Sequence, residues 1–247
     1  MKLLTYVILP DVHVPFHNKK LLNKVCKALL DLKPQGLVLS GDFLDLYTLS
    51  RHNAGSLQKL RHLTLTEEYK RGNQVLDQIL LACKSQELHY LWGNHEDNYL
   101  RYLQTDDNAK VGSALLSPTE ALRLRERGFR VYENWKEDSV LLGSHLEVIH
   151  GVYTCKHPSF KHLEDFEGSV VFGHTHKLSS YMTGKREAHN IGFLGDIDSL
   201  GFHYAAKAVR RKWRNGFALV NILDDGDFIV TPVSVWQNRF YLNGVLY

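Results

Sequence analysis

Short apolar runs alternate with helical spacing over the first part of the chain. Residues 5–9 and 36–40 are apolar runs that end beside polar residues or glycine, and both predict strands. Residues 19–32, which lie between them, carry apolar side chains at helical spacing. A second helical stretch at 66–83 leads into a strand-like run at 87–92. The first half therefore predicts repeated β-α-β units with parallel strands.

The helical pattern thins out from residue 129 onward, and short apolar runs follow one another. The predicted strands of this half are residues 129–132, 140–142, 146–149, 170–172, 217–222 and 228–233. No stretch rich in proline, glycine or serine separates the two halves. The pattern predicts an α/β (α+β) protein whose residues 1–247 form one domain, with two packed β-sheets and helices outside them.

Two stretches are harder to assign. Residues 100–130 are polar, charged and rich in arginine, and residues 184–214 show no clear period. We expect both to be excursions close to the functional site.

Length and composition are those of an ordinary globular protein: 247 residues, 44% hydrophobic and 23% charged. No apolar run approaches the roughly 18 residues that span a bilayer, so we expect no membrane contact. The start lacks the small-residue cleavage site of a secretory signal, which favours a cytoplasmic location. The three cysteines are widely spaced and odd in number, which predicts buried free thiols rather than a disulfide framework.

Charge is less informative than histidine content. A formal net charge of +3 is too small to indicate nucleic-acid binding by itself. The 14 histidines are more telling, because several stand in short motifs beside Asp, Asn or Gly. That combination is typical of metal sites.

Five short motifs stand at the ends of predicted strands, where α/β folds place their ligands. They are Asp11-Val12-His13, Gly41-Asp42-Phe43-Leu44-Asp45, Gly93-Asn94-His95-Glu96, His150-Gly151 and Gly173-His174-Thr175-His176. A spacing of two directs both side chains to the same side of an extended segment, and a preceding glycine lets the chain approach an ion closely. Each motif is weak alone, but their fixed order at strand ends indicates one metal site.

The order DxH, GDxxD, GNHE, a lone His and GHTH resembles that of the calcineurin-like metallophosphoesterases. The motifs span residues 11–176, about two thirds of the chain, and residues 10–17 and 41–51 further resemble compact phage and bacterial members. This family includes phosphatases, nucleases, nucleotide phosphodiesterases and pyrophosphatases. The resemblance implies a four-layer αββα metallophosphoesterase sandwich with two mixed sheets, and a cytoplasmic location in a bacterial or phage-infected bacterial cell.

The resemblance also implies two divalent metal ions. One would be held by Asp11, His13, Asp42 and His176, and the other by Asp42, Asn94, His150 and His174. Oxygen and imidazole ligands without a thiolate suit Mn²⁺ best, with Fe, Zn²⁺, Ni²⁺ and Mg²⁺ as alternatives. Two such ions lower the pKa of a shared water, and the resulting metal-bridging hydroxide would be the nucleophile.

His95 resembles the family's catalytic histidine, which protonates the departing oxygen or stabilises the charged phosphoryl group. Asp45 would orient it, because a carboxylate on one ring nitrogen fixes the tautomer. The alternative for Asp45 is that it caps the following helix. Glu96 could hydrogen-bond to a metal ligand or interact with the dipole of the helix whose first turn it occupies. The dipole interaction is the slightly favoured interpretation.

Candidate substrate contacts follow from position and charge. Arg51 and His52 come shortly after the GDxxD motif, as does Asn53. The second set is a basic run with interleaved aromatic residues, typical of proteins that follow a nucleic-acid backbone and stack its bases. It comprises Lys207, Arg210, Arg211, Lys212 and Arg214, with Tyr204, Trp213 and Phe217. A solvated surface run explains it at least as well.

Three functions remain open. The favoured hypothesis is a phosphodiesterase acting on nucleic acid, DNA or RNA, or on nucleotides; the alternative is a phosphomonoesterase acting on a small molecule or nucleotide. The family's protein phosphatases carry Arg after the second Asp of GDxxD, but here Leu46 follows Asp45, which disfavours that branch. A non-catalytic scaffold is the third hypothesis, and the complete ligand set argues against it. The oligomeric state stays open.

Overall fold

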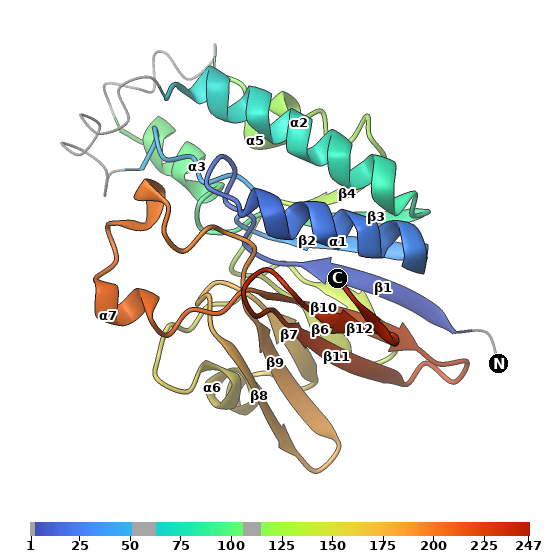
Figure 1. Cartoon of the computed structure of the whole chain (residues 1–247). Helices are drawn as coiled ribbons and strands as arrows, with labels where there is room; N and C mark the ends of the chain where they lie inside the picture. The colour runs from blue at the N-terminus through green and yellow to red at the C-terminus, as the bar shows by residue number, and fades with distance from the viewer. Residues whose placement is uncertain (1–2, 51–62, 106–114) are drawn as a thin grey trace.

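Two β-sheets are packed face to face, with helices on both outer faces (Figure 1). The computed structural model describes residues 3–50, 63–105 and 115–247. Its layers confirm the predicted arrangement of two mixed sheets flanked by helices.

The larger sheet combines strands from both halves of the sequence. It contains β1 (Leu4–Leu9), β2 (Gly36–Ser40), β3 (Glu87–Leu91), β4 (Phe129–Tyr132), β10 (Gly216–Ile222) and β11 (Phe228–Ser234), in the order β11-β10-β1-β2-β3-β4. Strands β1 to β4 are parallel, and β10 pairs antiparallel with β1. The β-rich second half of the chain therefore does not form one sheet by itself, because β4, β10 and β11 complete the sheet begun by the first half.

The smaller sheet has the order β5-β6-β7-β9-β8. Its strands are β5 (Val140–Leu142), β6 (Leu146–Val148), β7 (Ser169–Phe172), β8 (Leu178–Thr183) and β9 (Arg186–Ile191). Strand β9 falls in the region 184–214 that was predicted to be an excursion, and that prediction was wrong for residues 186–191. Its buried polar side chains His189 and Asn190 hide the strand pattern, and they contact Ser180 and Thr175. A small hairpin of β12 (Tyr241–Leu242) and β13 (Val245–Leu246) follows at the C-terminal end.

Long helices cover the outer face of the larger sheet. Helix α1 (Lys19–Leu32) begins after Asn18, whose side chain accepts a hydrogen bond from the amide of Leu21 at 3.1 Å. Helix α2 (Leu65–Cys83) begins in the same way after Thr64. Their buried faces pack on the sheet in one apolar cluster. This helical layer corresponds to the amphipathic stretches of the sequence.

A shorter helix, α6 (Pro158–Asp165), covers the outer face of the smaller sheet. Its Leu163 packs against Val170 and Phe172 of β7. The other helical segments are α3 (Asp97–Leu103), α5 (Pro118–Ala121), a 3-10 turn at Leu200–Phe202, and α7 (Lys207–Arg210). Together with the α1 and α2 layer, α6 completes the four-layer order helix, sheet, sheet, helix.

The sheets meet in an apolar core that is closed to solvent. Ile8 and Val38 from the larger sheet face Val148 and Val171 from the smaller one, and all four are fully buried. Strand β2 is buried on both faces, which explains why its sequence is a continuous apolar run rather than an alternation.

The structure also tests two expectations drawn from composition. Within residues 3–50, 63–105 and 115–247, no helix is long and apolar enough to cross a membrane. The cysteines are free, as predicted. Cys26 and Cys83 are buried, but Cys155 is exposed, so the expectation of burial was wrong for that residue.

Candidate metal centre

The predicted metal ligands lie on loops that leave strands of both sheets. Asp11 and His13 follow β1, Asp42 follows β2 and Asn94 follows β3. From the smaller sheet, His150 follows β6 shortly after its end, and His174 and His176 follow β7. Three groups of side chains have ligand atoms within 4.8 Å of one another: Asp11, His13 and His176; His13, Asp42 and His95; and Asp42, His150 and His174. The sandwich thus gathers histidines and aspartates from both sheets at one edge.

The backbone at these positions is unusual. Asp11, His13, Asp42, His174 and His176 all have positive φ, between 44° and 64°. Left-handed backbone at a non-glycine residue costs on the order of 1–3 kcal/mol and persists where the surrounding structure determines it. Such positions cluster at functional sites, so the concentration here marks these loops as built for positioning side chains.

Two glycines allow the loops to pass close to carboxylates, as their place in the motifs suggested. A Cβ atom at Gly93 would collide with the Asp42 carboxylate. A Cβ atom at Gly173 would collide with the carboxylate of Asp11. No other residue type fits at either position without moving a candidate ligand.

The first group presents a ring nitrogen whose tautomer is set by its surroundings. His13 Nδ1 lies 2.9 Å from Asp45 Oδ2, so the carboxylate holds the proton on that nitrogen. The lone pair of His13 Nε2 then faces His176 Nε2 at 3.0 Å, and Asp11 Oδ1 lies 3.9 Å away. His176 Nδ1 is buried without a hydrogen-bond partner among the described residues. A divalent cation fits this group, because it can accept electron pairs from both imidazoles and the carboxylate.

The group of Asp42, His150 and His174 is also held by a hydrogen bond to a ring nitrogen. His150 Nδ1 lies 3.1 Å from the carbonyl oxygen of Ser40, to which it donates a hydrogen bond. His150 Nε2 lies 3.0 Å from Asn94 Oδ1, 3.1 Å from His174 Nδ1 and 3.3 Å from Asp42 Oδ2. Burial lowers the pKa of His150, but the Asp42 carboxylate outweighs burial and raises the pKa to about 9, so Nε2 carries a proton that a bound cation would replace. Several electron-pair donors face one another here, and a cation among them would satisfy them together.

Asp42 belongs to the group of His150 and also approaches His13 of the first group. Its Oδ2 atom is 3.3 Å from His150 Nε2 and 3.8 Å from His13 Nε2. Burial by itself would raise the pKa of Asp42, but the facing rings of His150 and His95 outweigh it and hold the pKa well below its ordinary value. The carboxylate is therefore ionised at neutral pH, as a ligand shared by two cations must be.

His95 is held by backbone groups rather than by a carboxylate. Its Nδ1 lies 2.7 Å from the carbonyl oxygen of Asp45, and its amide donates to Asp42 Oδ1 at 2.8 Å. The Asp45 carboxylate is 3.6 Å from His95 Nδ1, farther than its 2.9 Å contact with His13. The structure thus places Asp45 differently from the expectation: its peptide carbonyl orients His95, while its side chain orients His13.

Electrostatics favour a protonated His95. Burial lowers its pKa, but the carboxylates of Asp42 and Asp45 outweigh burial and raise the pKa to about 9. Its Nε2 atom lies 3.9 Å from Asp42 Oδ2 and is directed into the cluster. A ring in this position can carry a proton beside the two groups of candidate ligands.

Glu96 has a larger role than its place in the sequence indicated. It is fully buried, and its carboxylate accepts hydrogen bonds from the amides of Asp42, Leu44 and Gly93 at 2.8–2.9 Å and from the Tyr90 hydroxyl at 2.9 Å. Glu96 therefore ties the loop after β2 to the loop after β3. This contradicts the helix-dipole interpretation, and the donors are mostly peptide groups that no sequence pattern shows.

Aromatic side chains from residues 193–213 pack against the candidate ligands, and sequence analysis named only Trp213 among them, as a residue for stacking on bases. Phe193 stacks on the His176 ring with centroids 4.5 Å apart, and Trp213 packs edge-on to the same ring at 4.5 Å. The Phe202 and His13 rings meet edge to face, with their centroids 5.2 Å apart. Apolar residues within an otherwise polar excursion were the only signal of this packing.

The candidate substrate-binding residues lie in different environments. Arg51, His52 and Asn53 lie outside the described residues. Lys207 is exposed in α7, and Arg211 is exposed beside a cavity. Arg210 is half-buried, and its guanidinium donates to the carbonyl of Ile197 at 3.0 Å.

Comparisons with known proteins give distant similarities. No protein-family model matches the chain. The Gene 54 protein of Mycobacterium phage D29 is 20% identical over 252 residues, covering 96% of each chain. One similar solved structure is Vacuolar Protein Sorting 29 of Cryptosporidium parvum, with 13% identity and a TM-score of 0.49 over 99% of this chain and 95% of that one. A second is Zn²⁺-complexed Vps29 of Entamoeba histolytica, with 13% identity and a TM-score of 0.48 over 99% of this chain and 96% of that one. A third is a predicted phosphoesterase of Streptococcus pneumoniae TIGR4, with 14% identity and a TM-score of 0.42 over 100% of this chain and 97% of that one.

Proposed function

We propose that the chain is a dinuclear-metal-dependent phosphoester hydrolase of the calcineurin-like kind, and that it acts on phosphodiesters of nucleic acid or nucleotides. The observation that carries this proposal is the position of the Asp42 carboxylate, whose Oδ2 atom lies 3.3 Å from His150 Nε2 and 3.8 Å from His13 Nε2 and so connects the two sets of candidate ligands. Two adjacent cations that share one carboxylate are a recurrent solution for phosphoryl chemistry.

Two divalent ions, with Mn²⁺ as first choice, would supply charge neutralisation and a lowered water pKa when bound. Asp11, His13 and His176 would hold one ion, and Asn94, His150 and His174 the other, with Asp42 shared. No cysteine belongs to these groups, in agreement with a hard or borderline metal.

The chain's own groups would handle the leaving oxygen. His95 is kept in place by the Asp45 carbonyl and has a raised pKa, so it can donate a proton from Nε2 to the departing alkoxide. Glu96 would keep the loops that carry Asp42 and Asn94 at a fixed separation. We expect this chemistry to take place in the cytoplasm.

The first test compares substrates in the presence of Mn²⁺ or of a chelator. We expect bis-p-nitrophenyl phosphate and a labelled DNA strand to be hydrolysed with Mn²⁺ and not with EDTA, and p-nitrophenyl phosphate to react more slowly. Hydrolysis of the monoester alone would make the protein a phosphatase. Stoichiometric metal with no turnover of any ester would favour the scaffold hypothesis instead.

Replacing His95 tests the proton donor. We expect His95→Ala to retain its metal and to lose about 10²–10⁴-fold in turnover of diesters with poor leaving groups, the usual worth of general acid catalysis. Substrates with a p-nitrophenolate leaving group need less protonation and should be affected less. The matched control is His145→Ala, an exposed histidine of the β5–β6 turn. A wild-type rate for His95→Ala on poor leaving groups contradicts the assignment.

A further inference from the structure

Two cavities open side by side next to the metal centre. The first, of about 490 Å³, is lined by residues 156–160, 177–181 and Lys212. The second, of about 600 Å³, is lined by residues 211–215 and 234–237 with Leu178 and Ile197. Leu178 and Lys212 belong to both linings. The cavities therefore adjoin, and we call them together the basic groove.

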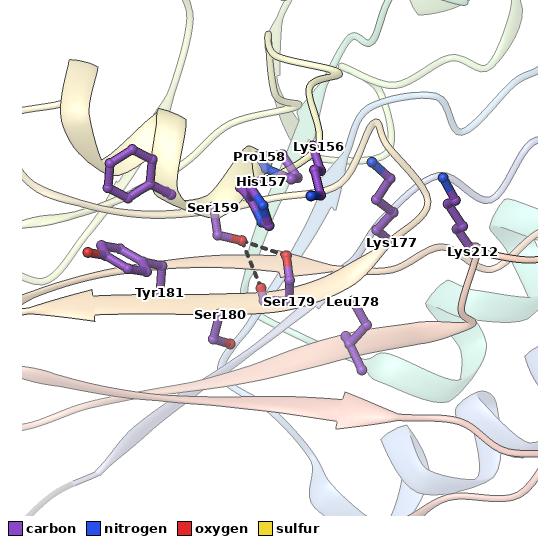
Figure 2. Close-up of a pocket in the computed structure, with 11 residues that line it drawn as sticks. Lys156, His157, Pro158, Ser159, Lys177, Leu178, Ser179, Ser180, Tyr181 and Lys212 are labelled. Atoms are coloured by element: carbon purple, nitrogen blue, oxygen red, sulfur yellow. Dashed lines mark hydrogen bonds between the residues drawn. The ribbon is translucent and has the colours of Figure 1, made fainter. Parts of the chain in front are cut away.

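The charge of the basic groove has one sign. Its linings contain Lys156, Lys177, Arg211, Lys212 and Arg214 and no aspartate or glutamate. None of these five cations forms an ion pair within the part of the chain that the structure describes. In Figure 2, Lys156, Lys177 and Lys212 come from three separate segments and lie toward the same end of the first cavity. A recess with unneutralised cations favours an anionic ligand.

The basic groove begins beside a candidate metal ligand. Lys177 directly follows His176, and the amide of Arg214 donates to the His176 carbonyl at 2.8 Å. Trp213 also packs on the His176 ring. The segments that carry Lys177 and Arg214 are thus held against His176, and a polymer bound in the groove would extend from the metal centre.

Aromatic side chains stand in both cavities. Phe160 and Tyr181 are each 40% exposed, and their rings meet edge to face with centroids 5.0 Å apart. Tyr181 lies at the opposite end of the first cavity from Lys177 and Lys212 (Figure 2). In the second cavity Trp236 is 60% exposed, with the Arg214 guanidinium 4.8 Å from its ring centroid. Exposed rings among cations suit a ligand that carries both phosphates and flat bases.

From these observations we propose that the basic groove binds single-stranded nucleic acid and leads the strand to the metal centre. The inference rests on the proposed function only for what happens at that centre, because binding itself needs no hydrolysis. The lysines and arginines contact phosphates, and Tyr181 and Trp236 stack on unpaired bases. A duplex fits less well, because its bases already stack on one another and their faces are hidden.

Binding is tested with the full chain by fluorescence anisotropy of a labelled single-stranded oligonucleotide, in EDTA to prevent cleavage and again with Mn²⁺. We expect tighter binding of the single strand than of the duplex. Replacing Lys156, Lys177 and Lys212 together with alanine should weaken binding at least about tenfold. The slope of log affinity against log salt should fall by about 2, since each phosphate contact on a single strand contributes about 0.7.

The matched control is alanine replacement of Lys24, Lys27 and Lys70, which lie on α1 and α2 on the far side of the larger sheet. It changes the net charge equally and should leave affinity within about twofold of wild type, because non-specific long-range attraction is screened by salt. An equal loss of affinity in both triple variants would overturn the proposal.

The aromatic residues separate nucleic acid from other polyanions. We expect Tyr181→Ala to weaken single-strand binding about tenfold without changing the salt slope, and Tyr181→Phe to bind like wild type, because stacking needs the ring and not the hydroxyl. Inorganic polyphosphate that competes as well as the oligonucleotide, together with unchanged binding by Tyr181→Ala, would show a groove for anions in general and overturn the proposal.

The two proposals can fail separately. Wild-type protein that hydrolyses bis-p-nitrophenyl phosphate but does not bind the single strand refutes the groove proposal and leaves the hydrolase intact. Wild-type protein that binds the strand and hydrolyses no ester refutes the hydrolase and leaves the groove.

Discussion

Asp42→Ala should release both metal ions. Among the described residues, Asp42 is the one carboxylate within 4.0 Å of both His13 and His150, at 3.8 Å and 3.3 Å. Loss of a partner that only supports a ligand costs about 10–100-fold in metal affinity, so loss of a shared ligand should cost more than about 100-fold at each site. Turnover should fall with occupancy. Mn²⁺ content after gel filtration and calorimetric titration measure the effect.

Two variants control this result. Asp42→Asn keeps the shape of the side chain but not its charge, and should also bind Mn²⁺ weakly if the shared anion is what matters. Asp77→Ala removes a half-exposed carboxylate of α2 that pairs with Arg127, and should bind Mn²⁺ like wild type. Full occupancy in correctly folded Asp42→Ala would overturn the shared position assigned to this residue.

Glu96→Ala should lower the free energy of unfolding more than the other single substitutions do. Its carboxylate accepts four buried hydrogen bonds, and removal leaves three peptide donors and the Tyr90 hydroxyl without their partner. An unsatisfied buried donor costs about 1–3 kcal/mol, so we expect a loss of at least about 4 kcal/mol in the free energy of unfolding. Urea denaturation in EDTA, followed by circular dichroism, separates this loss from any change in metal binding.

Glu96→Gln provides the graded comparison, because it keeps the volume and one acceptor oxygen and should lose about half as much. Glu126→Ala removes an exposed glutamate whose pair with Arg123 lies at the surface, and should change stability by less than about 0.5 kcal/mol. A loss below about 1 kcal/mol for Glu96→Ala would show that the surrounding loops do not depend on this carboxylate.

The strands and helices that sequence predicted well are those whose environment repeats locally. Helix α1 and strand β2 show an amphipathic stripe and a doubly buried run, and both patterns are visible in a short window. Strands β8 and β9 were missed because β8 is largely exposed and β9 buries polar side chains. Partners were harder still: nothing in the pattern of β10 shows that it pairs with β1.

The candidate ligands were accessible to sequence analysis because each stands at the end of a predicted strand and parallel strands end at the same edge. The hydrogen bonds that hold these ligands in place could not be predicted from the sequence. Asp45 binds His13 through its side chain and His95 through its carbonyl, and Glu96 binds three amides. These contacts join residues from separate loops, and they exist only once the chain is folded.

The basic run at 207–214 shows the same limit. Its charges suggested one continuous surface, but Arg210 hydrogen-bonds the Ile197 carbonyl, and Phe217 is buried in β10. The cations of the run that do line the basic groove are joined there by Lys156 and Lys177, which stand far away in the sequence. A charge run thus indicated the neighbourhood of the groove but not its members.

The pairing of β1 with β10 also determines when the larger sheet can be completed during synthesis. Leu4 pairs with Ile222, so one edge of β1 stays open until residue 222 has left the ribosome. By then every candidate metal ligand, up to His176, has already emerged. An unpaired edge next to exposed apolar faces is a site of aggregation in nascent chains. A ribosome-bound chain that stops before residue 216 therefore carries all the candidate ligands but lacks the strand that pairs with the open edge of β1.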